Sequence, residues 1–285
     1  MRSARTLDLL TVVYSEELEL LRLQAVSMYN RFRSSDLGLI LVMVNDDDLV
    51  ADSIDISWWG PLSDKVRILT RNDVGYTVGP GINGWYSQQI MKLLGCAQST
   101  ADWCMILDAK TWFVKDYDRD TFFEGDCAKF GKILVPKVFE PGQQYMESLF
   151  KIASSSHIAP GGVPFLMKPM LVRNMMDEIE RITDRAFVLW FEENCYLNKN
   201  CVTEFICYSV YVHWQHGIEK FYCGKSSVSV HNLADWQVEK EFDSWYSAIH
   251  LDSAFTVSIQ DRAMPLLSEE QKAKFRTYLA SRGIE

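Results

Sequence analysis

The chain has 285 residues, of which 48% are hydrophobic and 24% are charged. That composition is typical of a globular protein and excludes a disordered, collagen-like or coiled-coil chain as a description of the whole. With 29 Lys and Arg against 38 Asp and Glu, the formal net charge is −9. Coating a nucleic-acid backbone needs clustered basic side chains, so the acidic balance argues against a nucleic-acid partner. Because no linker or internal repeat is visible, we expect one domain over residues 1–285.

The seven cysteines are odd in number and scattered, without a Cys-x-x-Cys pair. This pattern fits reduced thiols in a reducing compartment better than a disulfide framework. The first apolar run, over residues 7–14, is interrupted by Asp8 and followed by two acids, unlike a signal peptide. No stretch approaches the ~18 apolar residues of a membrane span. We therefore expect a cytoplasmic protein without a transmembrane segment, and peripheral contact with a membrane stays open.

Taken in chain order, the first 115 residues predict a β-α-β-β-α-β succession. The expected strands cover residues 7–14, 37–45, 65–70 and 103–107, and the expected helices cover 15–33 and 85–94. Gly95 is the expected stop of the second helix. Continuous apolar runs such as LGLILVMVN are typical of strands that are buried on both faces. The alternation therefore predicts an α/β fold with a mostly parallel central sheet covered by helices.

The second half is less regular. The expected strands are 132–138 and 165–170, and the expected helices are 172–183, 203–214 and 265–282. Ser268, followed by Glu269 and Glu270, is the expected start signal of the last helix.

Ligands of open parallel sheets bind at the carboxyl ends of the strands. The polar run from Asn45 to Asp48 and the single Asp108 both follow predicted strands. The sequence therefore predicts a binding site that includes both.

Several blocks of the chain resemble nucleotide-sugar glycosyltransferases of the GT-A type, and most closely the DUF6492-like family. They are TVVYSEELELLRLQAVSMY, GWYSQQIMKLL, the strand MILDAKTWF, Thr203-Glu204-Phe205 and Ile249-His250. The resemblance implies a GT-A-like (Rossmann-like) fold with a nucleotide-sugar-binding half, residues 1–115. The remaining half, 116–285, lies on the acceptor side and ends in a helix. It also implies transfer of a sugar from a nucleotide-sugar donor to a glycan or other hydroxyl acceptor, in polysaccharide biosynthesis.

In such enzymes the strand ends in an Asp-x-Asp motif that holds Mn²⁺ or Mg²⁺ on the donor diphosphate. Here the motif reads Asp108-Ala109-Lys110. A hard cation prefers carboxylate oxygens, so an ammonium in the second position removes a ligand and adds repulsion. Either Lys110 neutralises the leaving diphosphate in place of a metal, or this chain has lost catalysis. The resemblance leaves Asp108 and His250 as metal candidates, and His250 also as a donor-binding residue.

The resemblance also implies the remaining donor-binding residues. Tyr86, Gln89 and Lys92 recur every third residue and share one face of the predicted helix. Tyr14 is placed to stack on the base, and Asp46 to bind the base or ribose.

An inverting transferase needs a carboxylate base for the acceptor hydroxyl. Glu204 is the candidate, joined to Asp108 and Lys110 as catalytic residues, with Glu192 and Glu193 as rivals. Two other functions stay open. One is a catalytically inactive GT-A-like binding protein. The other is a nucleotidyltransferase, for which the sequence offers neither a glycine-rich signature loop nor a clear acidic metal site.

Overall fold

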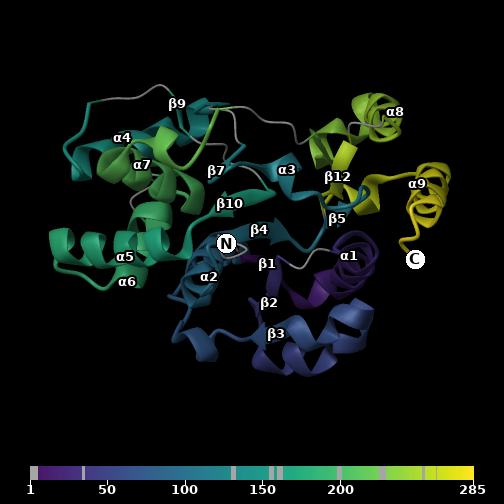
Figure 1. The fold of residues 1–285 in the computed structure, drawn as a ribbon, viewed down its shortest axis with the longest axis horizontal. Helices are drawn as coiled ribbons and strands as arrows, with labels where there is room; N and C mark the ends of the chain where they lie inside the picture. The colour runs from purple at the N-terminus through teal and green to yellow at the C-terminus, as the bar shows by residue number, and fades with distance from the viewer. Residues whose placement is uncertain are drawn as a thin grey trace.

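In the computed structural model, the protein is an α/β fold built on a five-stranded sheet (Figure 1). The structure describes residues 6–33, 36–129, 133–153, 157–158, 163–197, 201–224, 229–251, 254–260 and 262–285. The sheet order is β10-β4-β1-β2-β3. Its strands are β1 (Leu7–Val13), β2 (Leu37–Val44), β3 (Val66–Leu69), β4 (Trp103–Asp108) and β10 (Phe165–Met167). Only β10 pairs antiparallel, which confirms the predicted mostly parallel sheet.

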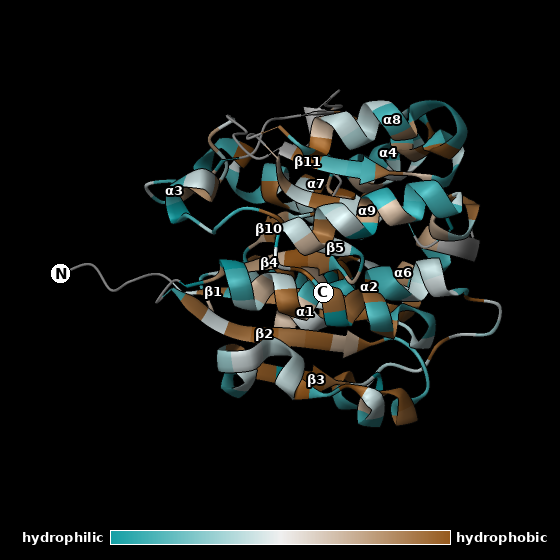
Figure 2. Ribbon diagram, turned by 90° about the vertical axis from the view of Figure 1, so that its right-hand side faces the viewer, coloured by the Kyte–Doolittle hydropathy of each residue, from teal (hydrophilic) through white to brown (hydrophobic). Residues whose placement is uncertain are grey.

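Two long helices complete the predicted β-α-β-β-α-β order, namely α1 (Leu18–Arg31) and α2 (Gly84–Gln98). A 3-10 turn over Ser15–Glu17 precedes α1. Figure 2 shows the hydrophobic strand β2 with its arrowhead at the right, which marks the carboxyl edge of the sheet. Helix α2 follows β3, so its N-terminus lies toward this same edge. The residues of β1 and β4 are nearly all buried, as the apolar runs predict.

Gly95 does not end α2 but lies buried inside it. A Cβ built on Gly95 would lie 2.7 Å from Leu10 Cδ1 and 2.7 Å from Met43 Sδ. The glycine therefore lets α2 approach β1 and β2 closely. Glycine is common just after the end of a helix, so the sequence alone predicts a helix end at Gly95. Its packing against the sheet is a tertiary contact that the local sequence does not encode.

A second, three-stranded sheet in the order β11-β12-β5 has its own hydrophobic core. Its strands are β11 (Ser229–Leu233), β12 (Ala254–Ile259) and β5 (Thr111–Phe113). Helices α8 (Val238–Ile249) and α9 (Glu269–Ser281) supply much of that core. Ser268 caps α9 by accepting from the Gln271 N–H over 3.2 Å, as predicted.

The chain end returns to the first helix. Arg22 donates to the Glu285 carbonyl over 2.9 Å, and Asn30 donates to the Gly283 carbonyl over 2.6 Å. Arg31 donates to the Arg282 carbonyl over 2.7 Å. Figure 1 shows the C-terminus beside α1.

The remaining helices lie beyond β10, on the left of Figure 1. They are α4 (Glu140–Leu149), α5 (Pro169–Thr183), α6 (Phe187–Glu192) and α7 (Glu204–His216), with the short α3 (Arg119–Phe122) elsewhere. Four short strands are β6 (Phe123–Glu124), β7 (Cys127–Ala128), β8 (Ile133–Leu134) and β9 (His157–Ile158). The strand predicted over 132–138 thus shrinks to β8, and a 3-10 turn follows it. Within the described ranges, no helix is long and apolar enough to cross a membrane.

Replacing Gly95 by Ala tests the close contact between α2 and the sheet. Alanine favours a helix interior by about 1 kcal/mol over glycine. Overpacking of a filled core costs about 1–3 kcal/mol. We expect Gly95→Ala to lower the free energy of unfolding in urea, whereas Gln98→Ala, at an exposed position of the same helix, leaves it unchanged. A more stable Gly95→Ala variant would contradict the packing described here.

Candidate functional site

The carboxyl edge of the main sheet collects polar side chains from elements that are far apart in sequence. Asp108 ends β4, Tyr14 follows β1 and Asn45 follows β2. Because these strands are parallel, their ends meet at one edge, where ligands of open α/β sheets bind. Helices α2 and α7 add Lys92 and Glu204 to the same place.

One buried ammonium group joins two carboxylates at this edge. Lys92 Nζ lies 2.8 Å from Asp108 Oδ1 and 3.2 Å from Glu204 Oε1. The side chains of Lys92 and Glu204 are 4% and 5% exposed, whereas that of Asp108 is 22% exposed. Asp108 Oδ1 is buried, so the exposed part of that side chain lies away from Lys92. We call Lys92, Asp108 and Glu204 the buried charge cluster.

The cluster shifts the pKa of each member. Burial lowers the pKa of Lys92, but the charges of Asp108 and Glu204 outweigh it, so the net pKa is raised. Burial raises the pKa of Asp108, yet Lys92 and then Lys110 bring it below its ordinary value. For Glu204 burial prevails over the attraction of Lys92, and its pKa is raised. Lys92 is therefore a firmly charged group, and Asp108 is the more readily ionised of the two acids.

Hydrogen bonds from α2 fix the start of α7 within the cluster. Gln89 lies one turn before Lys92, and its Oε1 accepts from the Glu204 N–H over 3.3 Å. Thr203 caps α7 by accepting from the Ile206 N–H over 3.3 Å. The predicted shared face of Gln89 and Lys92 is thus present, and it meets Glu204 as well as Asp108. The half-buried ring of Tyr86 packs edge-on against Trp85, with 4.9 Å between centroids.

Lys110 extends the row of alternating charges. Its Nζ lies 3.5 Å from Glu17 Oε1, and its charge also acts on Asp108. The order Glu17, Lys110, Asp108, Lys92, Glu204 therefore places an ammonium between each successive pair of carboxylates. Two of the five groups are cations at the strand end where the Asp-x-Asp motif is expected.

The donor set near Asp108 does not fit a divalent cation. Lys92 already binds one oxygen of Asp108, and Lys110 adds a second positive charge nearby. Hard cations need several oxygen ligands, mostly carboxylates. In the described part of the chain, no three His, Cys, Asp or Glu side chains are grouped to hold a metal. His250, the other proposed ligand, lies at the end of α8, where its ring contacts Tyr246 and Tyr278.

A second polar network surrounds the fully buried Asn45. Its Nδ2 donates to the Tyr14 hydroxyl over 2.6 Å and to Ser87 Oγ over 2.9 Å. The Tyr14 hydroxyl donates to the Gly84 carbonyl, and burial raises the pKa of Tyr14. Arg71, which the sequence reasoning missed, donates from Nε to Asn45 Oδ1 over 3.0 Å. A lone cation after a short strand belongs to no motif, so the sequence offered no signal for it.

The other acids named from the sequence have distinct partners. Asp46 accepts from the Ser15 hydroxyl over 2.6 Å, and this bond lowers its pKa. Glu192 accepts from the Tyr76 hydroxyl over 3.0 Å and from the Gly79 N–H over 3.1 Å. Glu192 thereby ties the segment around Gly79, which precedes α2, to α6. Glu193 forms an ion pair with Arg185. Among the contacts of the described residues, neither Glu192 nor Glu193 forms a hydrogen bond or ion pair with the buried charge cluster.

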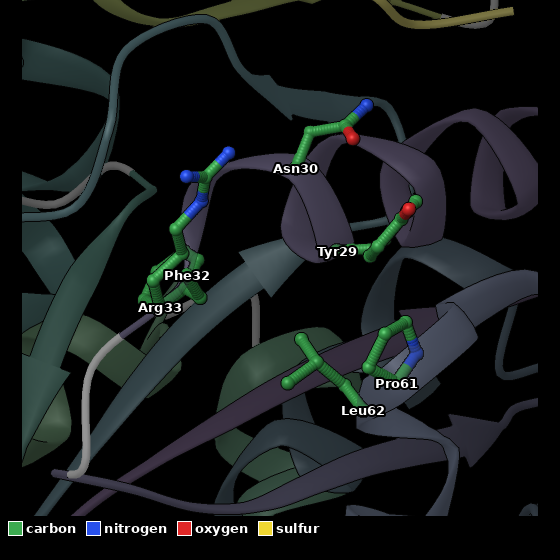
Figure 3. A pocket seen from close by; sticks show the side chains of 6 residues that line it. All are labelled: Tyr29, Asn30, Phe32, Arg33, Pro61 and Leu62. Carbon is green, nitrogen blue, oxygen red and sulfur yellow. The ribbon is translucent and has the colours of Figure 1, made fainter.

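A pocket on another side of the molecule contains none of the predicted site residues. It lies between the end of α1 and the 3-10 segment Ile56–Lys65 (Figure 3). Its lining consists of Tyr29, Asn30, Phe32, Arg33, Pro61 and Leu62.

Removing the ammonium of Lys92 tests the energetics of the cluster. Lys92→Met leaves two buried carboxylates without compensation, and we expect a loss of about 3–5 kcal/mol in the free energy of unfolding. Adding Glu204→Gln should recover part of that loss because one uncompensated charge disappears. Lys272→Met, which removes a surface pair on α9, is the control and should cost less than about 1 kcal/mol. Urea unfolding at neutral pH measures all three, and a Lys92→Met variant as stable as the parent would refute the assignment.

No curated protein matches the chain. A solved structure of the galactosyltransferase LgtC in complex with donor and acceptor sugar analogs is 12% identical, covering 96% of this chain and 95% of that chain at a TM-score of 0.48. Mouse xyloside xylosyltransferase 1 in its apo form is 9% identical, covering 88% and 97% at a TM-score of 0.44. The profile of a family of unknown function, DUF6492, matches residues 11–280. The chain belongs to the DUF6492 family.

Proposed function

We propose that the protein is a glycosyltransferase that moves a sugar from a nucleotide-sugar donor to the hydroxyl group of a glycan or other acceptor. The observation that carries the proposal is the strand-terminal Asp108, bound by the buried Lys92 and flanked by Lys110. This arrangement places fixed charge at the carboxyl edge of a parallel sheet, where nucleotide ligands bind. The sequence blocks that resemble GT-A enzymes include these same three residues.

Lys110 is the proposed partner of the leaving diphosphate. Transfer of the sugar breaks its bond to the diphosphate, on which negative charge then develops. A preorganised cation at that position stabilises the transition state more than the ground state. The side chain of Lys110 is 16% exposed, whereas that of Lys92 is 4% exposed and contacts Asp108. Lys92 therefore supports the site, and Lys110 reaches the ligand.

We further propose that transfer does not depend on a divalent metal. The positive charge that such an ion supplies in Asp-x-Asp enzymes comes here from two ammonium groups beside Asp108. An ion placed between them would meet like charge at a distance where Coulomb repulsion is strong.

The burial of Glu204 favours a supporting role over the role of base that the sequence suggests. Glu204 is 5% exposed and faces Lys92, whereas the 22% exposed Asp108 presents part of its side chain to the edge of the sheet. We propose that Asp108 contacts the donor and that Glu204, held by Gln89, positions Lys92 and Asp108.

The first experiment is thermal melting of the protein against a panel of nucleotide sugars, with Mn²⁺ and with EDTA. A donor at ~100 times its dissociation constant stabilises the folded state by about 2.7 kcal/mol. We expect a shift with one nucleotide family that EDTA leaves unchanged. No shift with any donor would remove the proposal. A shift without sugar transfer to any hydroxyl acceptor would favour a catalytically inactive binding protein, and release of diphosphate from a nucleoside triphosphate would favour a nucleotidyltransferase.

Paired variants separate the roles of the two acids. We expect Asp108→Asn to weaken donor binding and to lower turnover by roughly two or more orders of magnitude. Glu204→Gln should keep donor binding within a few-fold of the parent. Calorimetric binding and steady-state turnover measure the two effects. If Glu204→Gln instead lowers turnover by roughly 100-fold and Asp108→Asn does not, Glu204 is the base.

A further inference from the structure

Arg71 carries a guanidinium group that a neutral amide holds in place. Its Nε donates to Asn45 Oδ1 over 3.0 Å, and its Nη2 donates to the Asn45 carbonyl. Asn45 is itself fixed by Tyr14 and Ser87. Because the anchor is fully buried, the half-buried Arg71 side chain is oriented before any ligand arrives. A guanidinium has five N–H donors and no acceptor, so donors remain that Asn45 does not use.

Within the ranges that the structure describes, Arg71 forms no ion pair, although Asp46, Asp47 and Asp48 closely follow β2 and Asp73 follows β3. Each of these accepts from another group: Asp46 from Ser15, Asp47 from Leu49, Asp48 from Asn72 and Asp73 from Thr70. Asn45 engages only the Nε and Nη2 atoms of Arg71, so the remaining N–H donors can meet a ligand atom that accepts hydrogen bonds.

The sheet order places Arg71 at a defined distance from the diphosphate end of the site. Arg71 follows β3 and Asp108 ends β4, with β1 and β2 between them. Three strand spacings amount to about 14 Å along the carboxyl edge. That length is on the scale of an extended nucleoside diphosphate. If the diphosphate meets Lys110, the other end of the nucleotide, its base, reaches the region of Arg71.

We infer that Arg71 recognises the nucleobase of the donor and selects bases that carry a carbonyl oxygen where cytosine and adenine carry an amino group. The inference rests on the proposed function and names the nucleotide class of its donor. A carbonyl oxygen accepts a hydrogen bond from the guanidinium. An amino group would instead point its own N–H donors at those of the guanidinium, and no hydrogen bond would form. Uracil, guanine and hypoxanthine also carry a ring N–H beside that carbonyl. Asp46 directly follows Asn45 and is held by the Ser15 hydroxyl over 2.6 Å, so its carboxylate is the candidate acceptor for this N–H.

Two pairs of nucleotides that differ at the selected group provide the test. UDP and CDP differ at C4 of the pyrimidine, and inosine diphosphate and ADP differ at C6 of the purine. We expect the full chain to bind UDP more tightly than CDP, and inosine diphosphate more tightly than ADP, by about 10- to 100-fold in calorimetric titrations. Arg71→Lys keeps the charge but loses the planar fork, so it should reduce both preferences to a few-fold.

Arg67→Lys is the matched control because Arg67 lies on β3 and donates to the carbonyls of Asp64 and Val66. It should leave both preferences unchanged. Equal weakening of all four nucleotides in Arg71→Lys would show a phosphate contact and overturn the inference. Nucleotide binding without a base preference in the parent chain would overturn it as well, while leaving the proposed function intact. Absence of binding by all four nucleotides would remove both.

Discussion

The contact of Lys92 with two carboxylates is the interaction on which the rest of this site depends. A lone ammonium in so buried a position would lose its proton or unfold the chain, since burial alone disfavours the charged form. Asp108 and Glu204 reverse that balance. In return, the ammonium holds together an acid at the end of a strand and an acid at the start of a helix. Removing any one of the three changes the charge balance of the buried groups that remain, so the three act as a unit.

The sheet makes this unit possible because its parallel strands end at one edge. Tyr14 follows β1, Asn45 follows β2 and Asp108 ends β4 at that edge. At the carboxyl edge, two networks lie side by side in the strand order. One is ionic, around Lys92, and the other is largely neutral, around Asn45. Ion pairs and hydrogen bonds of a neutral amide therefore occupy separate regions of a single edge of the sheet.

Much of the main sheet is readable from the sequence because its strands are continuous apolar runs of strand length. The second sheet is not, since β11 and β12 are short and mix Ser, Thr, His and Asn with apolar residues. Helix α8 did carry a signal: Val238, Phe242, Trp245 and Ile249 recur at helical spacing and are buried.

For the site, the strand-terminal acid and the face of α2 were predictable, because both follow from local pattern. The contact between Lys92 and Glu204 joins residues 112 positions apart, so no local pattern encodes it. The same limit applies to the burial of Lys92, which depends on how α2, α7 and β4 pack together. Arg71 could not be predicted either, because it is a single residue in an irregular loop. Only its hydrogen bond to the Asn45 amide, seen in the folded structure, distinguishes it from other arginines.

The attachment of the chain end to α1 also has a consequence for biosynthesis. Arg22 on α1 binds the carbonyl of Glu285, a separation of 263 residues. At ~5–20 residues per second, the ribosome delivers that partner on the order of 10 to 50 seconds after α1 itself. During that interval Arg22 can pair with Glu19 on α1 but lacks its contact with Glu285. The first helix after β1 is therefore among the last to complete its native contacts, because it waits for a partner 263 residues away.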